Sequence, residues 1–131
     1  MAHPNEDRFR GGYAAFQTGD MDALRNEFLT SDVIWHQPGR NPQSGDYKGI
    51  DEVLASFGTS MELTGGNFSV EIHDCLANDE HGTVLATVRG QRPDGRSLED
   101  NYVHVVHFRD GKVAESWIHS WDQHKVDEFW A

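Results

Sequence analysis

Two histidines in strand-like segments are the side chains of this sequence best suited to acid–base chemistry. His36 follows the apolar run 33–35 and begins a loop punctuated by glycine and proline, whereas His104 lies in the alternating segment 97–108. Imidazole has a reference pKa of about 6.5, so it can take up and return a proton near neutral pH without a cofactor. We therefore expect His36 at the mouth of a pocket, as the base that removes a proton beside a carbonyl group.

The dipeptide Asp110-Gly111 is the strongest hairpin signal of the sequence. If these two residues form the whole turn, Arg109 pairs with Lys112, and directly opposed residues share one face of the sheet. That face carries Phe108, Val113 and Val106 near the turn. Farther from the turn it carries Tyr102, His104, Glu115, Trp117, His119 and Trp121. In a dry core each polar group would need a partner, whereas aromatic walls with a few polar groups are typical of a ligand pocket.

The predicted pocket residues divide into two groups by their chemistry. His104, oriented by Glu115 diagonally across the hairpin, would donate a hydrogen bond to a carbonyl that becomes an enolate. Such a donor supplies on the order of 2–4 kcal/mol where water is excluded. With His36 as the base, these three residues form the predicted catalytic set. The predicted substrate-binding set is Tyr102, Trp117, His119 and Trp121, of which Tyr102 or His119 could share the donor role.

These residues predict isomerisation or aldol-type cyclisation of a small apolar substrate, without a cofactor. Two other functions are compatible with them. The domain could bind a small apolar molecule without acting on it, with the histidines and Tyr102 as hydrogen-bond partners. His36, His104 and His119 could also hold zinc, copper or iron. The sequence has no compact ligand motif such as a histidine pair at helical spacing, so no metal is predicted.

Hydrophobic spacing predicts helices followed by a sheet. Apolar residues recur at helical spacing in segments 5–18, 21–28 and 50–61; Gly19 follows the first segment as a helix stop, and Gly65-Gly66 ends the third. From residue 67 the period changes to two over four successive strand segments. With the short strand before His36, this order predicts an α+β fold, in which three helices cover one face of a curved, mostly antiparallel sheet. Segment 122–131 could add a final helical turn.

Composition limits the partners. The 131 residues suit one domain, 1–131, and the net charge of −11 without a basic cluster disfavours nucleic acid. A single cysteine, Cys75, excludes an internal disulfide, and no apolar run reaches the length of a membrane span. Because the first residues lack the apolar core of a signal peptide, we expect a cytoplasmic protein that does not bind membranes.

The opposite face of the predicted hairpin is small and apolar. It would carry Val103, Val105, His107, Ala114, Ser116 and Ile118. Exposed apolar area of this kind usually marks an interface, so we expect a homodimer formed through the outer face of the sheet.

Three stretches of the sequence are similar to one known family. These are Gly19-Asp20 between the first two predicted helices, DVIWHQPG with GDYKG after it, and RDGKV followed by a tryptophan. Together they resemble the SnoaL-like polyketide cyclase branch of the nuclear transport factor 2-like superfamily, which also contains ketosteroid isomerase. The resemblance spans nearly the whole chain and implies a cone-shaped α+β barrel. It says less about the reaction, because the superfamily includes isomerases, cyclases, hydrolases and binding modules.

The resemblance also implies positions for site residues. Matching the PQSG segment, 42–45, with the Pro-x-Ser-Gly loop of ketosteroid isomerase puts His36 where that family carries its general-base aspartate. Matching backward from the turn 110–111 puts His104 at the position where ketosteroid isomerase carries the protonated aspartate of its oxyanion hole. Trp121 then falls at an aromatic pocket residue, in agreement with the face predicted from the hairpin.

Two positions depart from the family pattern. The oxyanion tyrosine of ketosteroid isomerase corresponds to Gly12, and Tyr13 is one residue further on, which turns a helical side chain by about 100°. The SnoaL-like cyclases carry an acidic residue late in the last strand, where this sequence has Trp117, Ile118 and His119. The resemblance therefore supports the general reaction class rather than the steroid reaction or that particular cyclase design.

Overall fold

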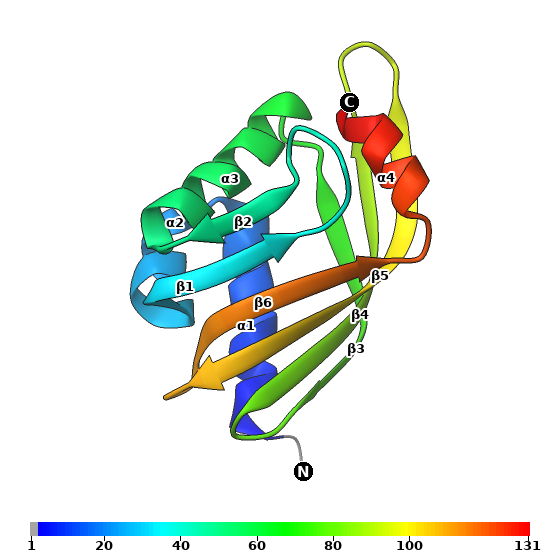
Figure 1. Cartoon of the computed structure of the whole chain (residues 1–131). Helices are drawn as coiled ribbons and strands as arrows, with labels where there is room; N and C mark the ends of the chain where they lie inside the picture. The colour runs from blue at the N-terminus through cyan, green and yellow to red at the C-terminus, as the bar shows by residue number, and fades with distance from the viewer. Residues whose placement is uncertain (1–2) are drawn as a thin grey trace.

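Six β-strands form one curved sheet around the interior of the molecule (Figure 1). The computed structural model describes residues 3–131. The strands are β1 (Leu29–Gln37), β2 (Gly45–Lys48), β3 (Ser69–Ala77), β4 (His81–Gln91), β5 (Ser97–Arg109) and β6 (Lys112–Ser120), in the order β2-β1-β6-β5-β4-β3 across the sheet. Neighbouring strands run antiparallel except for β1 and β6, which are parallel.

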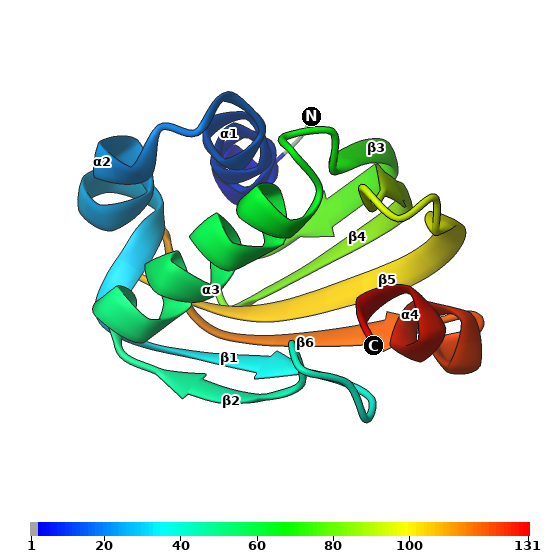
Figure 2. The same ribbon diagram turned by 90° about the horizontal axis from the view of Figure 1, so that it is seen from above.

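Helices cover one face of this sheet, which we call the inner face; the opposite face is the outer face. Figure 2 shows α1 (Pro4–Thr18), α2 (Met21–Ala23) and α3 (Ile50–Leu63) on the inner side. The helix α2 continues directly into a π-helical turn, η1 (Leu24–Phe28), and α4 (Gln123–Trp130) follows the last strand. The predicted α+β fold is confirmed, with β2 as an additional strand. No helix within residues 3–131 is both long and apolar enough to cross a membrane.

Residues at both ends of α1 fix where this helix begins and ends. The Nδ1 atom of His3 accepts a hydrogen bond from the backbone N–H of Asn5 at 3.1 Å, which caps the first turn. Gly19, with a φ of 74°, ends the helix in the left-handed conformation that glycine adopts without strain. Between these ends Phe9, Tyr13 and Phe16 recur at helical spacing and pack toward the interior.

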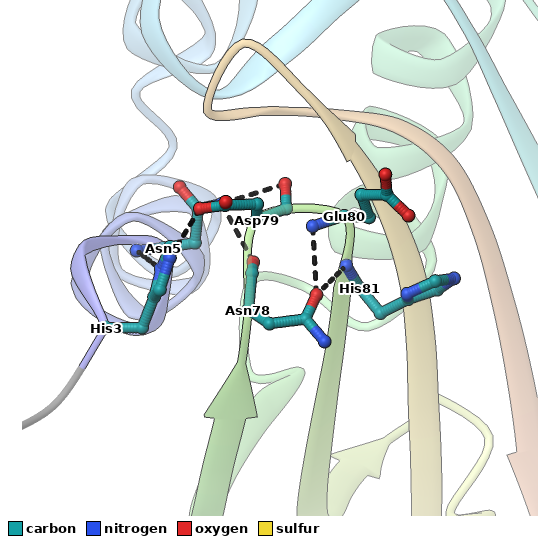
Figure 3. Close-up of polar contacts among 6 residues, drawn as sticks. All are labelled: His3, Asn5, Asn78, Asp79, Glu80 and His81. Atoms are coloured by element: carbon teal, nitrogen blue, oxygen red, sulfur yellow. Dashed lines mark hydrogen bonds and ion pairs between the residues drawn. The ribbon is translucent and has the colours of Figure 1, made fainter.

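Polar contacts fasten the start of α1 to the turn between β3 and β4 (Figure 3). The buried Asn5 donates from Nδ2 to the carbonyl oxygens of Asn78 at 3.1 Å and Asp79 at 3.4 Å. His3 Nε2 lies 2.7 Å from Asp79 Oδ1, and the Asn78 side chain accepts from two backbone N–H groups of the same turn at 2.9 and 2.7 Å. Because a buried amide needs its hydrogen-bond partners, these contacts fix the position of α1 over the sheet.

The β5–β6 hairpin corrects the predicted register. The two-residue turn forms as predicted, with both residues at positive φ. A β-bulge follows at once, because Phe108 pairs with Val113 whereas His107 pairs with Glu115, which leaves Ala114 as an extra residue of β6. One extra residue moves every later side chain of a strand to the other face of the sheet. Residues 115–120 therefore lie on the face opposite to the predicted one.

The loop 38–44 and α4 close one end of the cone. The Asp127 carboxylate on α4 accepts hydrogen bonds from the backbone N–H of Arg40 at 3.0 Å and from Asn41 Nδ2 at 2.8 Å. Gly39, with a φ of 92°, runs so close to α4 that an added Cβ would collide with Gln123 Nε2 and Asp127 Oδ1. The loop can dock in this way because Gly39 has no side chain.

Candidate functional site

The inner face of the sheet and the helices enclose a cavity of about 140 Å³. Its walls are mainly apolar and include Phe9, Phe16, Trp35, Phe57, Ile118 and Trp130. An apolar cavity of about 150 Å³ takes up benzene, so this volume suits a molecule about the size of one ring. Concave apolar walls with a few polar groups are typical of a small-molecule site.

Four polar side chains form one hydrogen-bonded chain at the wall of the cavity. Ser116 Oγ lies 2.6 Å from His104 Nε2, and His104 Nδ1 lies 2.6 Å from Tyr13 Oη. Tyr13 Oη lies in turn 2.9 Å from Tyr102 Oη. His104 and both tyrosines line the cavity, whereas Ser116 is completely buried and does not. The chain thus begins in the core at Ser116 and reaches the cavity at His104 and the tyrosine pair.

Aromatic rings enclose the imidazole of this network. Phe9 and Trp35 meet the His104 ring edge-on, with ring centroids 5.2 and 5.0 Å away. His104 is only 2% exposed, and its burial lowers the pKa of the imidazole to about 3. The cause is desolvation, which disfavours the charged form. The His104 ring is therefore neutral at physiological pH.

Burial also raises the pKa of both Tyr13 and Tyr102, so their hydroxyls keep their protons. A neutral imidazole donates from one nitrogen and accepts at the other. If His104 Nδ1 carries the hydrogen, it donates to Tyr13; one tyrosine hydroxyl then donates to the other, and the second can donate to a ligand carbonyl. If Nε2 carries it, Tyr13 donates to His104, Tyr102 donates to Tyr13, and Tyr102 accepts from a ligand hydroxyl. The network therefore suits an oxygen of either kind.

Tyr13 lies in the cavity wall near the position where the family pattern would have placed a tyrosine, at Gly12. Both residues line the cavity, so the rotation of about 100° between them does not remove Tyr13 from it. An added Cβ at Gly11 would come 2.8 Å from Phe28, which shows how closely α1 approaches η1. Sequence reasoning did not assign Tyr13, although its helical spacing with Phe9 was a usable signal. Ser116 was also missed, because the predicted register put it on the outer face.

The predicted position of His36 at the mouth of the pocket is wrong. Its neighbours Trp35 and Gln37 line the cavity, so His36 between them points to the outer face. There His36 Nε2 lies 2.7 Å from Glu115 Oε2 and Nδ1 lies 2.7 Å from Asp46 Oδ1. These two hydrogen bonds, chiefly that to Glu115, raise the pKa of His36. An imidazole held between two carboxylates is a donor on both sides rather than a free base.

The bulge in β6 also removes the other predicted residues of that strand from the cavity. Glu115, Trp117 and His119 lie on the outer face, where the Trp117 ring stacks on His36 with centroids 5.3 Å apart. The expected contact of Glu115 with His104 is replaced by its contact with His36. Trp121 follows the strand, is 64% exposed and does not line the cavity. Tyr102 and His104 are the predicted site residues that the structure brings together.

The same arrangement separates the histidines considered as metal ligands. His104 is on the inner face of the sheet, whereas His36 and His119 are on the outer face. Across residues 3–131, no three histidine, cysteine or carboxylate side chains are grouped as metal ligands. The structure therefore does not assemble the three-histidine centre.

Replacing His36 by glutamine should leave the affinity for cavity ligands unchanged. It should cost at most about 1 kcal/mol of unfolding free energy, because Asp46 is exposed and solvent screens the ion pair between His36 and Asp46. A raised pKa means that the folded state holds the proton more tightly than the unfolded chain. The stabilisation by His36 is thus fully present at pH values below its pKa in the unfolded chain. It fades as the pH rises through its pKa in the folded protein. Urea unfolding at pH 6 and pH 9 measures this difference, and weaker ligand binding would contradict the outer position of His36.

A cone of curved sheet and helices around an apolar cavity is a fold that proteins of several functions share. The chain belongs to the SnoaL-like domain family, whose model matches residues 9–116. The structure of Bal32a, from a soil-derived mobile gene cassette, is similar with a TM-score of 0.92 and 34% identity, covering 97% of this chain and 96% of that one. An NTF2-like protein of unknown function from Burkholderia pseudomallei has a TM-score of 0.84 and 25% identity over 97% of each chain. An uncharacterized protein of Mycobacterium tuberculosis is 29% identical over 127 residues, 95% of each chain.

Proposed function

We propose that the protein binds a small, neutral, mainly apolar molecule in the cavity and acts on it by isomerase- or cyclase-type chemistry at a carbonyl group. The observation that carries this proposal is the pair of hydroxyls of Tyr13 and Tyr102, which lie 2.9 Å apart in the cavity wall and connect to the buried His104. When His104 donates to Tyr13, one tyrosine hydroxyl donates to the other, and the remaining O–H is available for a ligand oxygen.

The tyrosine pair supplies the electrophilic half of such a reaction. A carbonyl oxygen that gains negative charge would be stabilised by these donors, which are oriented in advance and shielded from water. No carboxylate lines the cavity within the described chain, and the low pKa of His104 makes it a weak base. The chemistry supported best therefore starts from a substrate that is already enolic, such as a β-dicarbonyl compound.

In that reaction the enol carbon attacks a second carbonyl carbon of the same molecule and one C–C bond forms. The oxygen of the attacked carbonyl becomes an alkoxide, which the tyrosine hydroxyls stabilise, and the proton of the enol oxygen ends on it. The product is an isomer of the substrate, so neither an oxidant nor a second reactant is needed. Mainly apolar walls suit the rest of such a molecule.

A second candidate function is binding without turnover. It is favoured by the position of His36, the predicted base, which lies on the outer face and cannot reach a ligand in the cavity. In this case the tyrosine pair would hold a ligand oxygen in place without changing it.

Calorimetric titration with para-propylphenol and propylbenzene tests the proposal, because the two probes differ only in the hydroxyl group. We expect the wild-type protein to prefer the phenol by about three- to tenfold, the value of one good hydrogen bond. The double variant Tyr13→Phe/Tyr102→Phe, which removes both hydroxyls, should lose this preference and keep its affinity for propylbenzene. A double variant that still prefers the phenol would contradict the proposal. Turnover of a linear triketone, followed by NMR, distinguishes the two candidates: cyclisation slowed by Tyr102→Phe supports catalysis, and binding alone supports the second function.

We also propose that a second copy of the chain covers the outer face of the sheet. No helix covers this face in Figure 2. On it Leu85, which is 39% exposed, pairs with Val103 across β4 and β5. Val105 pairs there with Trp117 across β5 and β6. Apolar side chains gathered on an uncovered sheet face favour self-association. We expect a wild-type dimer at micromolar concentration and a monomer for Val105→Arg, measured by sedimentation. A wild-type monomer would contradict this expectation.

A further inference from the structure

Gln43 is a buried polar residue of the cavity wall whose side chain has no hydrogen-bond partner within residues 3–131. It lies in the loop 38–44, lines the cavity and is 8% exposed. Its backbone is fixed on both sides, since its N–H donates to Asn41 Oδ1 at 2.8 Å and its carbonyl accepts from the Tyr47 hydroxyl at 2.8 Å. Among the described residues, the side-chain amide makes no hydrogen bond, and its oxygen and nitrogen keep some accessible surface, so they are free to bind a ligand.

Two further polar residues line the same cavity without side-chain hydrogen bonds in the described part of the chain. Gln37 ends β1 and shares the inner face with Trp35, and Ser120 ends β6 directly opposite Tyr102. We call Gln37, Gln43 and Ser120 the amide end of the cavity. Ser120 pairs with Tyr102, so this member of the amide end lies next to the tyrosine pair along the sheet. The cavity thus has two sets of polar groups within apolar walls.

All three groups of the amide end are neutral, which restricts what they can bind. A primary amide both donates and accepts hydrogen bonds, so it suits a hydroxyl, a carbonyl or another amide. It offers no charge to compensate a buried carboxylate, whose desolvation would be costly. Arg8 also lines the cavity, but its guanidinium already donates to the carbonyl oxygens of Gly111 and Glu27. The net charge of −11 further disfavours an anionic ligand.

We propose that Gln43 binds a second, neutral oxygen function of the ligand, so that the ligand carries two oxygen groups on a small apolar body. One oxygen meets Tyr13 and Tyr102, and the other meets the Gln43 amide. This inference rests on the proposed function, because it assigns the first oxygen to the tyrosine pair. It goes further by making Gln43 a specificity-determining residue that selects neutral difunctional molecules over monofunctional or anionic ones.

Tyrosol and para-propylphenol test the inference, because they differ only in a terminal hydroxyl in place of a methyl group. Calorimetry gives the ratio of their dissociation constants for the wild-type protein and for Gln43→Met, which keeps the side-chain length and removes the amide. We expect the substitution to shift this ratio against tyrosol by about three- to tenfold. Gln91→Met, at an exposed glutamine of β4, is the matched control and should leave the ratio unchanged.

A second variant tests the same contact by a gain of binding. Gln43→Glu introduces a negative charge and should favour tyramine, the ammonium analogue of tyrosol, by about tenfold or more relative to tyrosol. If both phenols bind the wild-type protein but neither variant changes the selectivity, the inference is overturned and the proposed function stands. If neither phenol binds the wild-type protein, the proposed function and this inference are overturned together.

Discussion

The His104→Gln variant is expected to lose less stability on acidification than the wild-type protein, by about 2 kcal/mol between pH 7 and pH 5. The pKa of His104 is about 3 in the folded protein, whereas an imidazole in the unfolded chain titrates near 6.5. Between these values the unfolded state binds one proton more than the folded state. Stability therefore falls with the pH in this window, by about 1.4 kcal/mol per pH unit, and a glutamine cannot contribute to that fall.

Urea unfolding at the two pH values measures the effect, and His36→Gln is its control. The pKa of His36 is raised, so this histidine stabilises the fold more at low pH, and its removal should increase the loss on acidification. The two variants are thus expected to deviate from the wild type in opposite directions. NMR of the wild-type imidazoles gives an independent reading that needs no variant. A His104 ring that is protonated at pH 5 would contradict the buried, neutral network.

The Gly39→Ala variant is expected to lose about 2–4 kcal/mol of unfolding free energy and to bind cavity ligands more weakly. The φ of 92° at this position is unfavourable for alanine, and the new Cβ would collide with Gln123 Nε2 and Asp127 Oδ1. The Asp127 carboxylate would then leave Arg40 and Asn41, so the loop carrying Gln43 would separate from α4. Chemical denaturation measures the stability, and calorimetry with para-propylphenol measures the affinity.

Gly95→Ala is the matched control for this substitution. Gly95 has a similar φ of 97°, but nothing lies within 4 Å of an added Cβ. It should therefore show the backbone strain alone, about 1–2 kcal/mol, with unchanged ligand affinity. Equal losses for the two variants would mean that the contact of the loop with α4 contributes little to the closure of the cavity.

The elements with a strong hydrophobic period were predictable from the sequence. The helical spacing of Phe9, Tyr13 and Phe16 and the stop at Gly19 correspond to α1, and the alternation from residue 67 corresponds to β3–β6. The strand β2 was missed because it is short and follows a segment rich in glycine and proline, which predicts a loop. Pairing with β1 stabilises it, and such a tertiary contact leaves no local signal.

The site was predicted only in part, because one bulge decides which side chains of β6 face the cavity. The turn at residues 110–111 fixed the start of the hairpin correctly, but the extra residue Ala114 cannot be recognised from alternation alone. Glu115, Trp117 and His119 together are poorly suited to an inner face, and this mixture argued against the predicted register of β6. A register shifted by one residue places Ser116 and Ile118 inside instead, which suits a buried face better.

The position of His36 was misjudged for a related reason. A histidine between an apolar strand and a flexible loop can face either side of the sheet, and the family resemblance favoured the inner side. The alternation of β1 assigns the cavity to Trp35 and Gln37 and leaves His36 outside. The resemblance was more useful for His104, which lies on β5. The count back from the turn and the alternation of β5 both put this residue on the inner face of the sheet.

A crystal structure of the wild-type protein with para-propylphenol tests the central claim most directly. We predict that the ring lies in the cavity, with its oxygen within hydrogen-bonding distance, about 3 Å, of the hydroxyl of Tyr13 or Tyr102. The His104 imidazole should remain bound between Tyr13 and Ser116. A phenol found only on the outer face, beside His36 and Trp117, with the cavity unchanged, would contradict the assignment of the tyrosine–histidine network as the functional site.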